Sequence, residues 1–96
     1  MTGKLTEAEI AKGLSTSLGW DRVGDMIVRS WTFAMPRRAR EFALQVHELG
    51  ERKGQEPDVL LKGRGVRVEL SDHAVGGLTW NDFELAAEIE AIPADR

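Results

Sequence analysis

The fold of this chain is decided by residues 51–82, which read ERKGQEPDVLLKGRGVRVELSDHAVGGLTWND. Pro57 cannot continue a helix, because it lacks a backbone N–H and its ring clashes with the preceding turn. The apolar run at 59–62 and the alternating residues 66–70 predict two strands, separated by a glycine-containing turn at 63–65. This half of the stretch therefore predicts the end of a helix followed by a β-hairpin.

The second half of the stretch predicts a glycine-rich turn and the start of another helix. Thr79 and Asp82 have the spacing of a capping box, in which each side chain hydrogen-bonds to the backbone N–H of the other residue. His73 and the pair Gly76 and Gly77 precede this helix start. We expect residues 51–82 to form one wall of a small pocket.

Upstream of this stretch, the sequence first predicts a helix over residues 7–18. Thr6 and Glu9 form a second capping box, flanked by apolar residues that can pack as a hydrophobic staple. Leu14 and Leu18 continue the apolar spacing, and Gly19 is a typical helix stop.

A hairpin and a second helix are predicted to follow. Residues 20–23 and 26–33 flank the turn signal at 24–25, and the second of these arms is rich in β-branched and aromatic residues. Pro36 suits the first turn of a helix, whose apolar face recurs at helical spacing as far as Leu49. Leu44 faces the other way and is interpreted as a surface residue, with an oligomer contact as the alternative.

The predicted order of elements is α-β-β-α-β-β-α, because a final helix carries apolar residues from Leu85 to Ile92 and ends before Pro93. Two hairpins with interspersed helices predict a single α+β domain, with one antiparallel sheet of about four strands and the helices on one face. We expect the domain to span residues 5–93, with flexible tails at 1–4 and 94–96.

Composition excludes several classes of protein. The 96 residues contain no cysteine, so there is no disulfide framework and no thiolate metal site. The net charge of -3 argues against general nucleic-acid binding, and no apolar run is long enough to span a membrane. No secretory signal is recognised, so we expect a cytoplasmic protein. A domain of this size has a modest core, which favours a homodimer.

These landmarks resemble those of the pterin-4a-carbinolamine dehydratases. The family signature is an acidic residue, three spacers, His-His-Pro, five or six spacers, an aromatic residue, nine spacers, a histidine, and an aspartate after eight or more further residues. Glu51, Pro57, His73 and Asp82 fall on that spacing without a gap, and residues 76–79 match the family's turn into its last helix. The resemblance covers about residues 5 to 92 and implies the same fold.

The departures from the signature concern its chemistry. Gln55 and Glu56 stand where the paired histidines are expected, and Gly63 stands at the aromatic position. The resemblance implies that the family histidines move protons while a hydroxyl leaves the pterin ring. Gln55 cannot titrate, and Glu56 would need a pKa raised well above about 4.3 to carry a proton near neutral pH. These remnant positions, with His73, predict little dehydratase activity.

The signature residues each have a structural alternative. His73 is either a remnant proton carrier or a polar residue bonded within its turn, and we favour the turn. Gln55 and Glu56 form either a new polar binding edge or a solvated loop, and we favour the loop. Pro57, Gly76, Gly77 and Asp82 are interpreted as structural. His47 has no second ligand at metal spacing, so neither a metal site nor a cofactor is expected.

Arg37, Arg38 and Arg40 occupy the first turns of the second predicted helix. The positive end of a helix dipole disfavours cations by about 0.3 to 1 kcal/mol each when they are exposed. An acidic protein partner would relieve that cost, and so would the neighbouring Glu41.

Two functions follow from these observations. The first is a non-catalytic protein that acts by binding other proteins. It resembles the α-carboxysome group of this family, which lacks the catalytic histidines and assists Rubisco assembly. That resemblance implies Rubisco as the partner and an association with carboxysomes. The alternative is a divergent 4a-hydroxytetrahydropterin dehydratase that uses Glu56 and His73.

Overall fold

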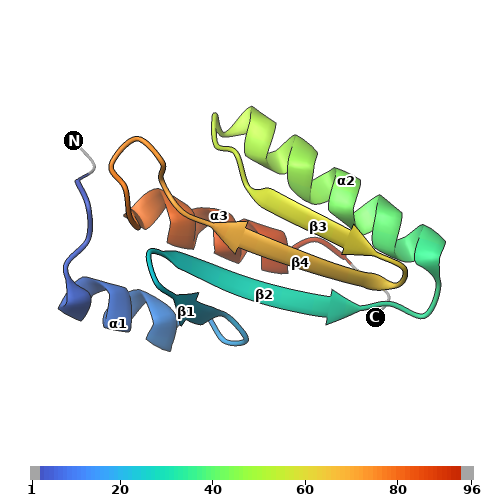
Figure 1. Ribbon diagram of the computed structural model, residues 1–96, viewed down its shortest axis with the longest axis horizontal. Helices are drawn as coiled ribbons and strands as arrows, with labels where there is room; N and C mark the ends of the chain where they lie inside the picture. Colours follow the sequence, from blue (N-terminus) through green and yellow to red (C-terminus); the bar gives the residue numbers. More distant parts are fainter. Residues whose placement is uncertain (1–2, 94–96) are drawn as a thin grey trace.

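Four antiparallel strands form one sheet in the order β1-β2-β4-β3 in the computed structural model, which describes residues 3–93 (Figure 1). The strands are β1 (Asp21–Val23), β2 (Met26–Thr32), β3 (Asp58–Lys62) and β4 (Gly65–Leu70). The helices are α1 (Glu7–Ser15), α2 (Pro36–Arg52) and α3 (Trp80–Glu90). The predicted α+β class and the order α-β-β-α-β-β-α are confirmed. The predicted tails at 1–4 and 94–96 lie outside the described residues, apart from Gly3 and Lys4.

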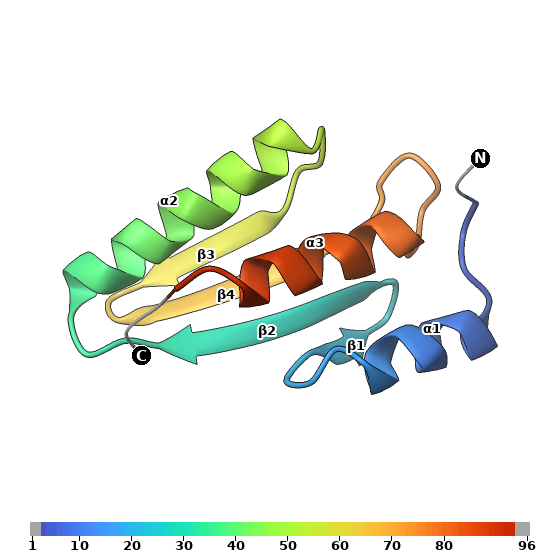
Figure 2. The same cartoon turned by 180° about the vertical axis from the view of Figure 1, so that it is seen from behind.

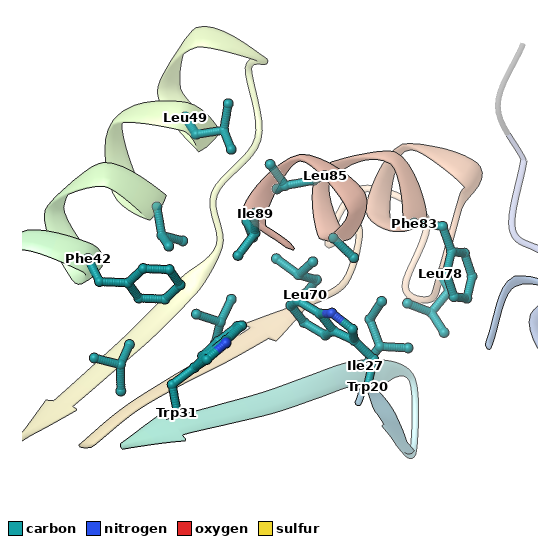
Figure 3. Close-up of a cluster of buried hydrophobic side chains, with 14 of the residues drawn as sticks. Trp20, Ile27, Trp31, Phe42, Leu49, Leu70, Leu78, Phe83, Leu85 and Ile89 are labelled. Carbon is teal, nitrogen blue, oxygen red and sulfur yellow. The ribbon is translucent and has the colours of Figure 1, made fainter. Parts of the chain in front are cut away.

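Helices α2 and α3 cover one face of the sheet, and α1 packs against α3 (Figure 2). The core lies between this face and the helices (Figure 3). Strand β4 alternates as predicted, with Val66, Val68 and Leu70 buried and the residues between them partly exposed. The predicted apolar face of α2 is also buried, whereas Leu44 on its outer side is 58% exposed.

Aromatic rings occupy the centre of this core. Trp31 packs edge-on against Trp20, with ring centroids 5.8 Å apart, and lies 4.8 Å from the ring of Phe42. Phe33 contacts the same Phe42 ring at 5.2 Å. Trp31 is therefore a core residue, whereas Trp80 at the start of α3 is 39% exposed.

Both predicted capping boxes are present. At α1, the Thr6 N–H donates to Glu9 Oε1 at 2.9 Å, and the Glu9 N–H donates to Thr6 Oγ1 at 3.2 Å. At α3, the Thr79 N–H donates to Asp82 Oδ2 at 2.9 Å. Both helices therefore begin where the local sequence predicts.

Two predicted helix ends are wrong. Helix α1 stops at Ser15 instead of Leu18, because the hydroxyls of Ser15 and Thr16 donate to the carbonyls of Lys12 and Gly13 and compete with the helical backbone pattern.

The consequence of the early α1 stop is that Leu18 is 81% exposed instead of continuing the apolar face. Helix α3 ends at Glu90, so Ile92 lies beyond the helix, where it is half-buried against the core. Pro93 follows closely, and a proline disfavours helical backbone in the residue before it.

The pairing of β2 with β4 is the long-range contact that organises the sheet. Ile27 lies opposite Leu70, and Trp31 lies opposite Val66, although α2 and β3 separate the two strands in sequence. The pairing of β3 with β4, in which Asp58 lies opposite Glu69, places the segment after β4 beside the segment that leaves α2. Across residues 3–93, no helix has the length and apolar character that a membrane span requires.

Candidate functional site

A cavity of about 260 Å³ opens where α2 leads into β3 and where β4 leads into the last turn. Its lining comes from two short segments of the stretch 51–82, one on each side. The lining residues are Gly54, Gln55, Glu56, Ser71, Asp72, His73 and Ala74. The structure therefore brings together the three remnant positions Gln55, Glu56 and His73.

The first rim is shaped by the way α2 ends. Gly54 adopts φ +69°, a left-handed conformation that favours glycine, and turns the chain out of the helix. The Gln55 N–H then donates to the carbonyl of Gly50 at 2.8 Å. Gly50 lets the chain fold back, because a Cβ there would lie 2.8 Å from Pro57 Cγ. Pro57 thus fixes the rim by packing against the helix that it follows.

The second rim is a tight turn after β4. The Asp72 N–H donates to the Gly77 carbonyl at 2.8 Å, and the Gly77 N–H donates back to Asp72 at 3.3 Å. Within this loop, Asp72 Oδ1 accepts from the Ala74 N–H at 3.0 Å. Gly76 adopts φ +66°, which lets the turn close. The loop therefore presents His73 at the mouth of the cavity.

The side chains at this mouth are available to a ligand. Among residues 3–93, those of Gln55, Glu56 and His73 form no hydrogen bond and no ion pair. Glu56 and His73 are exposed, and Gln55 is half-buried. The sequence favours a His73 side chain that is hydrogen-bonded within its own turn, and this prediction is wrong. The side chain of Asp72 makes the hydrogen bond within the turn instead.

Asp82 accepts from the Thr79 N–H at the start of α3 and does not line the cavity. Its side chain is 1% exposed, and burial raises its pKa above the ordinary value of 3.8. The hydrogen bond from the Thr79 backbone opposes that rise, the charge of Asp72 adds to it, and His73 lowers the pKa slightly. Asp82 is thus a helix cap that is electrostatically coupled to the rim.

Gly63, which stands at the aromatic position of the signature, does not line the cavity. It lies in the β3–β4 turn, directly beyond the Lys62–Gly65 pair. The cavity lies at the other end of the same hairpin, beyond Asp58 and Leu70. A five-residue strand spans about 16 Å, so a side chain at position 63 would not reach the cavity.

The arginine cluster forms a second surface, separate from the cavity. Arg37, Arg38 and Arg40 lie at the start of α2, whereas Gln55 and Glu56 follow its end. A 17-residue helix is about 25 Å long. The two groups of predicted binding residues therefore lie at opposite ends of α2 (Figure 1).

Sequence reasoning missed three residues of the second rim: Ser71, Asp72 and Ala74. Asp72 carried a usable signal, because aspartate often accepts a hydrogen bond from the backbone two residues later. Ser71 and Ala74 carried none, since only the turn geometry brings them to the cavity.

The cavity has limited capacity for acid–base chemistry. Its titratable side chains are Glu56, Asp72 and His73, and Asp72 is engaged in its turn. In the described part of the chain, no three His, Cys, Asp or Glu side chains are grouped so as to hold a metal ion. The arrangement suits binding of a small polar group.

A larger groove, of about 490 Å³, lies between the ends of α2 and α3. Its lining includes Glu48, Arg52, Glu88 and Ile92 and none of the signature positions. We therefore take the smaller cavity as the candidate site.

The chain is similar in sequence and in fold to proteins of one family. The sequence model of the family described as pterin 4 alpha carbinolamine dehydratase matches residues 3–92. A Roseiflexus castenholzii protein named for pterin-4-alpha-carbinolamine dehydratase is 38% identical over 92 residues, covering 96% of this chain and 99% of the relative.

Two solved structures share the fold. The transcriptional coactivator/pterin dehydratase from Brucella melitensis superposes with a TM-score of 0.88 at 29% identity, covering 94% of this chain and 98% of that chain. A pterin dehydratase-like protein described as a RuBisCO assembly factor in the alpha-carboxysome superposes with a TM-score of 0.62 at 19% identity, covering 80% and 89%. The second likeness is one of fold alone. The family match and the Roseiflexus relative together show that the chain belongs to the pterin-4a-carbinolamine dehydratase family.

Proposed function

We propose that this chain is a non-catalytic member of the family that acts by binding other proteins. The observation that carries the proposal is the pair Gln55 and Glu56 at the cavity mouth, where the family signature has two histidines. A glutamine side chain cannot accept or release a proton near neutral pH. A positioned acid–base group contributes about 10² to 10⁴ in rate, so its loss removes most of the catalysis.

A dehydration assay tests the loss of activity. The purified chain, given 4a-hydroxytetrahydropterin, should leave the rate close to that of the uncatalysed reaction. The variant Gln55→His/Glu56→His restores both signature histidines and should raise the rate, because the rest of the cavity is retained. Turnover of the unmodified chain within about a hundredfold of an active family member would contradict the proposal.

Rubisco is the specific partner that we propose to test first. Two observations support this choice. The chain keeps the family fold but lacks the paired histidines, and one structural neighbour is described as a RuBisCO assembly factor. On this proposal the protein works in the bacterial cytoplasm and meets its partner at carboxysome assembly. Co-expression with the large and small subunits of an α-carboxysomal Rubisco should increase the yield of assembled enzyme. An unchanged yield would rule out Rubisco as the partner, but it would not rule out binding of another protein.

The second candidate function is a divergent dehydratase. It is favoured by one observation, namely that Glu56 and His73 line the same cavity and that neither side chain is engaged within residues 3–93. In that case the unmodified chain would be active, and both Glu56→Gln and His73→Ala would abolish its activity.

A further inference from the structure

We infer that the start of α2 and the β3–β4 turn form one basic docking surface for an acidic segment of a partner protein that also carries apolar side chains. This inference rests on the proposed protein-binding function and specifies the surface and the chemistry of its partner. We call this surface the basic end. Its basic residues are Arg37, Arg38, Arg40, Lys62 and Arg64.

Two segments far apart in sequence meet at the basic end. The Phe33 N–H donates to the carbonyl of Arg64 at 2.9 Å, so the β3–β4 turn abuts the connection from β2 to α2. Lys62 lies at the end of β3, paired with Gly65. Figures 1 and 2 both show the start of α2 and this turn at the same end of the molecule.

The basic end concentrates positive charge in an acidic protein. Residues 33–41 and 62–67 contain one acidic residue, Glu41, whereas the whole chain has a net charge of -3. Four exposed cations of this surface have no carboxylate within ion-pair distance in the described part of the chain, namely Arg37, Arg40, Lys62 and Arg64. Of the other cations, Arg22, Arg29, Lys53 and Arg67 each pair with a glutamate, whereas Lys12 and Arg52 form no ion pair within residues 3–93.

The local helix geometry does not explain these charges. The first turn of α2 contains no acidic residue, and Met35 at the N-cap gives no side-chain hydrogen bond. The helix dipole therefore adds to the positive potential of the arginines instead of offsetting it. A carboxylate from a partner would offset both the repulsion among the arginines and their unfavourable interaction with the helix dipole.

The apolar neighbours of these charges favour a protein over a nucleic acid. Met35 and Leu61 are 43% and 44% exposed and adjoin the cations in sequence. Single-stranded nucleic acids bind best where bases stack on exposed aromatic rings. Phe33 at this end is buried, and the half-exposed Trp80 begins α3 at the opposite end. An acidic segment with interspersed leucines matches both the charge and the apolar contacts.

A peptide-binding assay tests the surface. The probe is a short fluorescein-labelled peptide rich in Glu with interspersed Leu, followed by fluorescence anisotropy. Arg37→Gln/Arg40→Gln and Lys62→Gln/Arg64→Gln should each weaken binding about tenfold, because each variant removes two exposed charge contacts. Lys12→Gln/Arg52→Gln removes two exposed cations outside the basic end and should change affinity by less than about twofold. Binding of the unmodified chain should weaken as salt screens the charges.

Several results would overturn the inference. Equal losses for all three double variants would mean diffuse attraction without a docking surface. Tighter binding of a single-stranded oligonucleotide than of the peptide would mean a nucleic-acid surface. Salt-sensitive multimers of the chain alone, lost in both basic-end variants, would mean that a second copy occupies the surface. Thermal melting confirms that each variant is folded.

The dehydration assay on the same proteins separates this inference from the proposed function. An active unmodified chain would defeat the non-catalytic assignment without affecting the peptide result. Absent peptide binding by an inactive chain would defeat the docking surface alone.

Discussion

At the scale of single residues, Asp82 shows how one side chain serves two purposes. It caps α3 through the Thr79 N–H, and its near-complete burial disfavours the charged form that caps best. The raised pKa follows mainly from desolvation and is reinforced by Asp72. The capping position was recognisable from the spacing of Thr79 and Asp82, but the near-complete burial of Asp82 was not.

Asp82 gives a stability prediction with a definite sign in pH. Because its folded-state pKa is raised, its contribution to stability is fully present below the ordinary value of 3.8 and is lost as the pH rises through the folded value. Asp82→Asn does not titrate, and its amide oxygen can still accept from Thr79. The stability of the variant relative to the unmodified chain should therefore increase with pH from 3.8 up to the folded pKa of Asp82 and stay constant above it. Urea denaturation at a series of pH values from 3.8 upward measures this difference, and a relative stability that never rises, or that falls, would refute the prediction.

The two buried tryptophans of the core give a matched comparison. Trp20 Nε1 donates to Glu90 Oε1 at 3.1 Å, whereas Trp31 Nε1 is buried with no acceptor among residues 3–93. Trp20→Phe loses a hydrogen bond to a charged group, and Trp31→Phe removes an unsatisfied donor. We expect Trp20→Phe to lower the free energy of unfolding by at least about 1 kcal/mol more than Trp31→Phe. Chemical denaturation measures the free energy of unfolding of both variants. Equal losses would show that the unpaired Trp31 N–H does not destabilise the protein.

At the scale of elements, the junction of α2 with β3 connects a helix end to the cavity. Gly50 is buried in the last turns of α2 against Pro57, and the Gln55 N–H bonds to its carbonyl. The sequence showed that the helix must end before Pro57. It did not show that the chain folds back tightly enough to require glycine at position 50.

Gly50→Ala tests this junction. In an exposed helix interior, alanine in place of glycine stabilises the helix by about 1 kcal/mol. At position 50, however, the alanine Cβ would lie 3.1 Å from the Gln55 carbonyl oxygen and closer to the Pro57 ring. We expect overpacking to dominate, with a loss of about 1 to 3 kcal/mol in the free energy of unfolding. Leu44→Ala, at an exposed position of the same helix, should change it by less than about 0.5 kcal/mol. A stabilised Gly50→Ala protein would show that the rim is pliable.

At the scale of the whole molecule, the sheet has two unequal edges. Strand β1 is three residues long, whereas the β3 edge is five residues long and carries Leu60 at 51% exposure. An exposed edge of this kind offers unpaired backbone groups to another strand. The open face of the sheet, opposite the helices, is the other surface available for association.

We predict that the chain forms a homodimer through the β3 edge. Light scattering at micromolar concentration should give about twice the 10.7 kDa of one chain. Leu60→Glu should shift the population to monomer, because it places a charge at the edge. Leu44→Glu, on the outer side of α2, should leave the dimer intact. A monomer at all concentrations would contradict the dimer, and sensitivity to Leu44→Glu alone would place the contact on α2.

The sequence by itself determined the elements, their order and the family, because caps, turns and alternation depend on residues within a few positions of one another. Thr6, Thr79, Pro57 and the alternating β4 strand are signals of this kind. The tertiary structure alone decided what lies beside what. Pairing of β2 with β4 across α2 and β3 is fixed by packing of the shared core, and no local pattern encodes it. That pairing brings Arg64 to the connection that leads into α2, whereas the β3–β4 hairpin puts His73 beside Glu56 and leaves Gly63 at its far end.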